Sequence, residues 1–194
     1  MAGFNYLLLF LFVVVSRQAV LAISYLNDEV INLPGWNSKS LPSRQFSGFV
    51  DANVEGSLQM HYWFVECESE TPTDAPLVLW FNGGPGASSL YGMLIELGPF
   101  IVSDLSFTGE TYESTGIPQL RYNEFGWQKV ANILALSMPP PVGFSFCNPP
   151  GASAKGDDCG AWDDTRTAEV TYYAIKSWLD RFPQYRYVEM YLTG

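Results

Sequence analysis

Five consecutive apolar residues, Leu77–Phe81, constrain the fold of this chain more than any other segment. A strand that faces water on one side alternates polar and apolar side chains, whereas this run is apolar on both sides. Such a run suits an interior strand of a sheet that helices cover on both faces. Asn132–Leu136 is a second run of the same kind. The two runs therefore predict a layered domain with a buried central sheet.

The other periodic segments indicate further strands and one long helix. Leu58–Val65 alternates, which predicts a half-buried strand near a sheet edge. A helical pattern ends at Pro183, and Asp163 and Asp164 lie where the helix dipole favours acidic residues. Its predicted buried stripe consists of Ala168, Tyr172, Ile175, Leu179 and Phe182. Tyr187–Thr193 alternates again, and the order strand, helix, strand predicts an α/β fold with a largely parallel, doubly wound sheet.

Gly83 and Gly84 directly follow the first apolar run and begin a glycine-rich loop that leads into a helical pattern. A glycine pair at the end of a strand lets the backbone turn sharply and leaves N–H groups that attract an anion. A dinucleotide-binding fingerprint is excluded because Ser89 occupies its last glycine position. A phosphate-binding P-loop is excluded because no Gly-Lys-Ser/Thr ending follows.

Three interpretations of the loop remain. Gly86, Ala87 and Ser88 match the start of a nucleophile elbow, G-x-S-x-G, but Leu90 occupies the place of its last glycine. Ser88 is therefore predicted to be a helix cap. The oxyanion loop of an α/β-hydrolase, whose backbone N–H groups stabilise charge on a carbonyl oxygen, uses every glycine. The remaining alternative is a turn without chemistry.

The charge balance and the histidine content exclude two classes of partner. The chain has 10 Lys and Arg against 20 Asp and Glu, so its formal net charge of −10 repels nucleic acid and anionic membranes. We expect no nucleic-acid partner. His61 is the only histidine, and no CxxC or HxxxH spacing occurs, so we expect no metal or other cofactor. His61, within a predicted strand, is expected to be structural.

Residues 1–22 are predicted to be a signal peptide. Leu7–Val15 is an apolar run of signal-peptide length, too short for a stable membrane span, which needs about 20 apolar residues. Val20 and Ala22 have the small side chains of a cleavage site, so we expect cleavage after Ala22.

Secretion would expose the three cysteines, Cys67, Cys147 and Cys159, to an oxidising environment in which thiols pair. Three is an odd number. Either one thiol stays free or a partner lies outside this sequence, and the pairing stays open.

Trp80–Phe100, WFNGGPGASSLYGMLIELGPF, resembles the oxyanion and carboxylate-binding segment of serine carboxypeptidases, whose usual wording is WLNGGPGCSSL followed by ELGP. Further similar segments begin, in order, at Leu33 (LPG), Arg44 (RQFSGFVD), His61 (HYWFVE), Asn123 (NEFGWQKVANIL), Pro139 (PxxVGFSF) and Asp180 (DRFPQYR). The resemblance implies an α/β-hydrolase fold with a mostly parallel central sheet and helices on both faces. Residues 23–194 would be the N-terminal part of that domain, truncated before the nucleophile elbow, whose first glycine would be Gly194.

The resemblance also implies roles for individual residues. Gly84 would supply an oxyanion N–H, and Asn82, Gly83 and Glu96 would bind the free carboxylate of a peptide's last residue. The implied activity is a serine-type carboxypeptidase that removes C-terminal residues from peptides or proteins, which are its expected partners. Without the resemblance, Asn82 would be a turn residue and Glu96 an exposed residue at a helix end.

The catalytic serine, aspartate and histidine of the family have no counterpart in this chain, so the chain by itself is predicted to be inactive. The implied location is the secretory pathway, with an extracellular or a vacuolar or lysosomal destination. A homodimer is one assembly that the sequence leaves open.

Two departures from the family pattern matter. Ala87 stands where cysteine is common, so one family disulfide cannot form. Ser137–Gly143 replaces the usual Glu-Ser-Pro-x-Gly-x-Gly, and Pro141 fixes φ where a glycine is typical. Two alternatives to the peptidase therefore stay open: an acyltransferase on the same scaffold and a non-catalytic relative.

Overall fold

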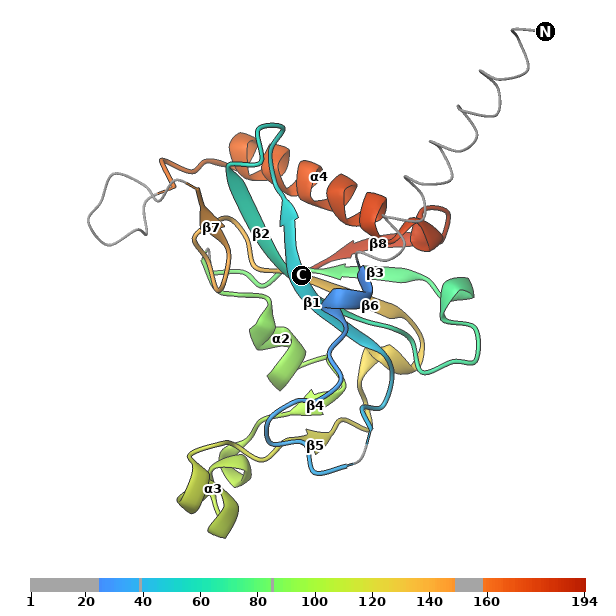
Figure 1. The fold of residues 1–194 in the computed structure, drawn as a ribbon, viewed down its shortest axis with the longest axis vertical. Helices are drawn as coiled ribbons and strands as arrows, with labels where there is room; N and C mark the ends of the chain where they lie inside the picture. Colours follow the sequence, from blue (N-terminus) through green and yellow to red (C-terminus); the bar gives the residue numbers. More distant parts are fainter. Residues whose placement is uncertain (1–24, 39, 85, 149–158) are drawn as a thin grey trace, which may run out of the picture.

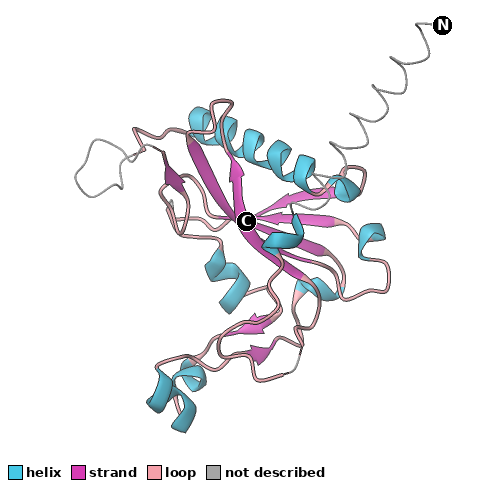
Figure 2. Cartoon of the chain, in the orientation of Figure 1, coloured by secondary structure: helices cyan, strands magenta, loops and turns pink. Residues whose placement is uncertain are grey.

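The protein is described by a computed structural model that covers residues 25–38, 40–84, 86–148 and 159–194. The predicted signal peptide, residues 1–22, lies outside these residues. Within them, a six-stranded sheet forms the centre and carries helices on both sides (Figures 1 and 2). Its strands are β1 (Gln45–Asp51), β2 (Leu58–Val65), β3 (Leu77–Trp80), β6 (Asn132–Leu136), β7 (Phe146–Cys147) and β8 (Met190–Thr193).

The strand order is β1-β2-β6-β3-β8, and β7 pairs with β2. The predicted parallel arrangement is found at β6, β3 and β8, because their connections are long enough to cross over. The pairs β1/β2, β2/β6 and β2/β7 are antiparallel. The loop from Ala52 to Ser57 between β1 and β2 is too short for a crossover. The sheet of the described residues is thus a mixed sheet within the predicted α/β class.

Two hydrophobic clusters lie on opposite faces of the sheet, because successive side chains of a strand point to opposite sides. On β2, Tyr62 and Phe64 belong to the first cluster, while Trp63 and Val65 belong to the second. The helix α4 (Asp164–Arg181) covers the first cluster, and α2 (Leu90–Ile95) covers the second. Figure 1 shows the two helices on the two sides of the strands. This arrangement confirms the predicted helices on both faces.

The buried face of α4 differs from the predicted stripe. The helix begins as predicted, because the Asp163 side chain accepts a hydrogen bond from the backbone N–H of Arg166 at 2.7 Å. The residues that it buries, however, are Val170, Ala174 and Trp178, whereas Tyr172 is 59% exposed. Both sets have helical spacing, so the period alone cannot choose between them.

The size of the side chains decides the orientation of α4. Trp178 stacks on Phe182 with ring centroids 4.7 Å apart, and it packs edge-on against Phe64 of β2 at 4.8 Å. Burial of Trp178 removes more apolar surface from water than burial of Tyr172 would, and the Tyr172 hydroxyl stays hydrated at the surface. Of the predicted stripe, Phe182 is fully buried in the same cluster, and Ile175 and Leu179 pack at its margin.

β2 has the predicted bounds but is buried on both faces rather than on one. A small lobe and α2 cover its second face, around Trp63. The lobe consists of β4 (Phe100–Ile101) and β5 (Arg121–Tyr122), which pair with each other, and α3 (Glu110–Thr115) beside them. Alternation within a strand cannot show that a distant segment will cover its polar face.

Candidate active site

The glycine-rich loop leaves the sheet at the C-terminal ends of the parallel strands. Trp80, the last residue of β3, pairs with Ala135 of β6 and with Thr193 of β8. The Phe81 N–H donates to the Thr193 carbonyl at 3.0 Å, and a Cβ at Gly194 would collide with the Phe81 carbonyl oxygen. In α/β sheets, ligands bind outside the carboxyl ends of the strands. The loop therefore lies at the edge where a site is expected.

Gly83 and Gly84 are exposed, and their backbone N–H groups donate no hydrogen bond to any residue that the structure describes. Gly84 has a φ of +141°, and a Cβ there would lie 3.2 Å from the backbone nitrogen of Ala87. Glycine is therefore required at this position. Two adjacent amides are left to donate to something outside this part of the chain.

Asn82 is held by its side-chain oxygen. Its Oδ1 accepts hydrogen bonds from Trp80 Nε1 at 2.7 Å and from the Gly92 backbone N–H at 3.1 Å. Both partners can only donate, so the amide oxygen must face them and Nδ2 must face the other way. Nδ2 makes no hydrogen bond within the described residues. Asn82 thus presents an oriented N–H donor beside the two glycines.

Trp80 and Gly92 are positioning residues that the sequence reasoning missed. A Cβ at Gly92 would collide with Trp80 Nε1, so only glycine allows the indole to reach Asn82. The signal was present as a tryptophan two residues before the asparagine and a glycine inside the following helix. Only the packing of α2 against β3 shows that the three residues form one unit.

Glu96 lies at the C-terminal end of α2 and is exposed. Its N–H donates to the Gly92 carbonyl at 3.1 Å, so it lies one turn, about 6 Å along the axis, from the residue that binds Asn82. Its carboxylate makes no hydrogen bond or ion pair within the described residues. The structure therefore links Asn82 and Glu96 through Gly92 without bringing their side chains into contact with each other.

Ser88 does not have the environment of a nucleophile. Its Oγ accepts from the Leu90 N–H at 3.3 Å and lies 2.9 Å from Ser137 Oγ. The predicted cap at Ser88 is wrong, however, because the N-cap position of α2 is Ser89. Ser89 is the residue that precedes the helix, and its Oγ accepts from the Asn82 N–H at 3.2 Å. His61, the only histidine of the chain, contacts Ser47 instead.

The segment Ser137–Gly143, whose sequence departs from the family pattern, packs directly against the glycine-rich loop. Gly143 has a φ of +61°, and a Cβ there would lie 2.8 Å from both Ser137 Oγ and Ser88 Oγ. The positive φ therefore falls at Gly143 rather than at Pro141. The start of the segment is linked to β2, because Ser145 Oγ donates to the Ser137 carbonyl and accepts from the His61 N–H.

Two of the three cysteines form a disulfide, Cys147–Cys159, with Cα atoms 5.6 Å apart. Cys67 is buried and forms no disulfide in the described part of the chain, and burial raises the pKa of its thiol. Within the described ranges, no group of three or more His, Cys, Asp or Glu side chains could hold a metal ion. Among the same residues, no helix has the length and apolar character that crossing a bilayer requires.

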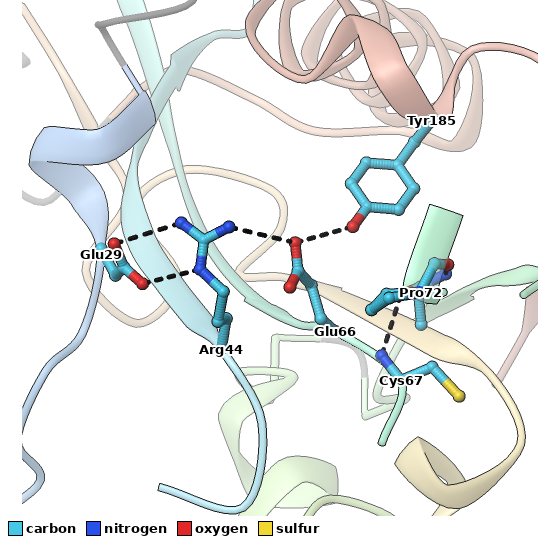
Figure 3. Close-up of polar contacts among 7 residues, drawn as sticks. Glu29, Arg44, Glu66, Cys67, Pro72 and Tyr185 are labelled. Carbon is cyan, nitrogen blue, oxygen red and sulfur yellow. Dashed lines mark hydrogen bonds and ion pairs between the residues drawn. The ribbon is translucent and has the colours of Figure 1, made fainter. Parts of the chain in front are cut away.

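A second polar cluster lies at the opposite edge of the sheet, where β2 ends (Figure 3). The guanidinium of Arg44 donates two hydrogen bonds to Glu29 and lies 4.0 Å from the carboxylate of Glu66. Glu66 is buried and accepts from Tyr185 Oη at 2.8 Å. The pKa of Glu29 is lowered, mainly by its hydrogen bond from Arg44. A cavity of about 920 Å³ adjoins this cluster.

Comparison with known proteins identifies the class. The family model described as serine carboxypeptidase matches residues 34–194, and this chain therefore belongs to the serine carboxypeptidase family. A prohormone-processing carboxypeptidase from Saccharomyces cerevisiae has the same fold, with a TM-score of 0.65, 23% identity and coverage of 88% of this chain and 35% of that one. The predicted family and the α/β-hydrolase fold are confirmed.

Among individual relatives, serine carboxypeptidase-like 27 of Arabidopsis thaliana is 37% identical over 98% of this chain and 39% of its own length. The lysosomal protective protein of Mus musculus is 38% identical over 86% and 30%. P-(S)-hydroxymandelonitrile lyase of Sorghum bicolor is 37% identical over 87% and 29%. The chain thus spans less than two fifths of these relatives.

Proposed function

We propose that the protein is a serine-type carboxypeptidase in which residues 23–194 form the N-terminal part of the hydrolase domain. The observation that carries the proposal is the pair of exposed amides at Gly83 and Gly84, which donate to no described residue and lie at the carboxyl ends of the parallel strands. Family membership supports the reaction class.

These amides act in the step in which negative charge develops on the substrate carbonyl oxygen. A serine oxygen adds to the carbonyl carbon of the last peptide bond, and the carbonyl oxygen becomes an oxyanion. The Gly84 N–H donates to that oxyanion. The C–N bond then breaks, the C-terminal amino acid leaves with a proton, and water hydrolyses the acyl-enzyme. The triad that performs the proton transfers has no counterpart in this chain, so the chain alone is expected to be inactive.

Recognition of a terminal carboxylate fits the remaining groups. Asn82 Nδ2 is oriented by the two bonds to its Oδ1 and can donate to a carboxylate oxygen, as can the Gly83 N–H. Glu96 can donate to a carboxylate only while it is protonated, and when ionised it repels one.

The proposed location is the secretory pathway, ending outside the cell or in a vacuole or lysosome. The expected signal peptide at residues 1–22 supports it, as does the Cys147–Cys159 disulfide, because disulfides persist in oxidising compartments. A relative named lysosomal protective protein also supports it.

The test uses the full-length protein with an N-acylated dipeptide and with the same dipeptide as its C-terminal amide. Asn82→Ala should raise KM for the free acid about 10- to 100-fold, the effect of losing a hydrogen bond to a charged group. KM for the amide should change little. Tyr172→Phe, on the exposed face of α4, is the matched control. Equal losses on both substrates would refute carboxylate recognition by Asn82.

The same assay separates the alternatives. Acyl-glucose offered with an alcohol acceptor tests the acyltransferase, which would use the same oxyanion loop, and turnover of acyl-glucose alone would replace the proposal. If a serine-directed phosphonate fails to label the full-length protein, the non-catalytic relative is correct. The rebuilt Ser137–Gly143 segment and a relative named as a lyase make both controls necessary.

A further inference from the structure

We propose that Trp127 is a positioning residue for carboxylate binding and that it acts on Asn82 through Trp80. The inference rests on the proposed function, because it takes Asn82 as a group that binds the free carboxylate of a peptide. Trp127 begins a short 3-10 helix, Trp127–Lys129, which precedes β6. It therefore reaches Trp80 from an element other than β3 or α2.

The indole of Trp80 is held at one atom by a hydrogen bond, because Nε1 lies 2.7 Å from Asn82 Oδ1. That bond does not by itself fix the plane of the ring, since the outer torsion of a tryptophan side chain is broad. Trp80 is only partly buried against the second hydrophobic cluster. The ring of Trp127 meets it edge to face, with centroids 5.8 Å apart and an interplanar angle of 81°. This contact restricts the tilt of the indole and so the direction in which Nε1 points.

The backbone of Trp127 is tied to α2, the helix that contains Gly92. The Trp127 N–H donates to the Leu97 carbonyl at 2.8 Å, and the Leu97 N–H donates to the Gly92 carbonyl at 2.8 Å. Carbonyl groups at the end of a helix have no partner within the helix, so the bond from Trp127 also completes α2. Trp127 and Gly92, which both lie against the indole of Trp80, are thus linked through Leu97.

Asn123 strengthens the link between the two segments. It is 2% exposed, and its Nδ2 donates to the carbonyls of Glu96 at 3.3 Å and Gly98 at 2.9 Å. Its backbone N–H donates to the Pro99 carbonyl at 2.9 Å. Every carbonyl of residues 96–99 therefore accepts from Asn123 or Trp127. These bonds hold the Trp127 ring at a fixed distance from the helix that binds Asn82.

A purely structural role is the alternative for Trp127. Its side chain is 40% exposed, whereas Trp178 in the core is fully buried, so Trp127 contributes less apolar burial to the fold. Its ring contacts the indole that orients Asn82. Loss of the ring should therefore disturb carboxylate binding while the domain stays folded.

The experiment measures steady-state kinetics of full-length variants on the N-acylated dipeptide and on its C-terminal amide. Trp127→Ala should raise KM for the free acid about 3- to 10-fold, the range expected for loss of one aromatic pair, and leave KM for the amide within about twofold. Trp127→Phe keeps an aromatic ring and should keep both values within about twofold. Phe125→Ala removes an 89% exposed ring from the same segment and is the matched control, with no change expected.

A double variant tests whether Trp127 acts through Asn82. When Asn82→Ala is already present, adding Trp127→Ala should raise KM for the free acid by less than about twofold, because the group that Trp127 positions is gone. Should Trp127→Ala fail to fold, Trp127→Leu fills part of the same space without an aromatic ring and carries the same expectations.

Equal changes on the acid and the amide in Trp127→Ala, or an undiminished effect in the double variant, would overturn the inference. If Asn82→Ala discriminates the acid from the amide but Trp127→Ala does not, the inference alone is wrong. If Asn82→Ala does not discriminate between them, the proposed carboxylate recognition is wrong, and the role of Trp127 falls with it.

Discussion

The two edges of the central sheet that are formed by opposite ends of its strands differ in whether their polar groups are hydrogen-bonded within the protein. At the edge where β2 ends, Glu66 accepts from Tyr185 and faces Arg44. The next N–H along the chain, that of Cys67, donates to Asn132 Oδ1 at 2.9 Å. At the edge where β3 ends, the N–H groups of Gly83 and Gly84 donate to no described residue.

The comparison teaches that unsatisfied donors indicate a site better than empty volume does. The cavity beside Glu66 has about 920 Å³, and Ser43 Oγ in its lining has no partner among the described residues, yet Glu66 and the Cys67 N–H, which also line it, are already hydrogen-bonded within the protein. Satisfied groups stabilise the fold, whereas exposed amides held in place can stabilise charge as it develops in a reaction. The proposed chemistry therefore belongs to the Gly83 edge.

The largest effect should follow a change at Gly84. Gly84→Ala adds a Cβ at a φ of +141°, 3.2 Å from the Ala87 nitrogen, and so moves the amide. Loss of an oxyanion donor typically costs about 10²–10³ in kcat. Steady-state kinetics on the full-length protein, measured well below its melting temperature, should show that loss, and the melting temperature should fall as well because alanine is strained at this φ. Unchanged kcat would show that the Gly84 N–H does not stabilise the oxyanion, and the proposed functional difference between the two edges would be wrong.

A smaller effect should appear as the pH dependence of stability, because the Gly83 edge also contains His61. Its folded pKa is about 4 and its ordinary value about 6.5, so the unfolded chain binds the proton first as pH falls. The free energy of unfolding should therefore be highest above pH 6.5 and fall by about 3 kcal/mol down to pH 4, at about 1.4 kcal/mol per unit.

Denaturant titrations of the full-length protein between pH 4 and pH 7 measure this loss. His61→Phe should remove the His61 contribution and flatten the profile by the same amount, with Tyr172→Phe as the control. A variant profile that is as steep as the original would show that His61 does not titrate in this window.

The smallest effect should come from the satisfied edge. Tyr185→Phe removes one hydrogen bond to the buried Glu66 and leaves Arg44 in place. Unfolding should become easier by about 2 kcal/mol, the usual value for a bond to a charged group, while kcat and KM stay the same. If Tyr185→Phe lowers kcat by tenfold or more at unchanged stability, the division between a structural and a functional edge is wrong.

Local pattern was enough to predict several elements. The apolar runs of β3 and β6, the bounds of β2 and the start of α4 at Asp163 follow from period, side-chain size and capping, all of which act within a few residues. The glycine-rich loop was predicted to leave N–H groups unpaired for the same reason: glycine turns sharply and offers no side chain to cover them. The family wording around Asn82 added the expected roles.

Longer-range packing could not be predicted in this way. The sequence did not reveal that α4 buries Trp178 rather than Tyr172, or that the lobe covers the second face of β2. It also did not show that Trp80 and Gly92 together aim Asn82. Each of these outcomes depends on which distant surface competes for a side chain.

The sequence by itself determined a buried sheet and a strand followed by two adjacent glycines, because periodicity and local backbone freedom are properties of neighbouring residues. Its motifs also determined the family to which the chain belongs. The tertiary structure alone decided which of those backbone amides stay unpaired and what His61 faces. Hydrogen bonding and burial depend on groups far apart in the chain, and only the assembled fold brings those groups together or keeps them apart.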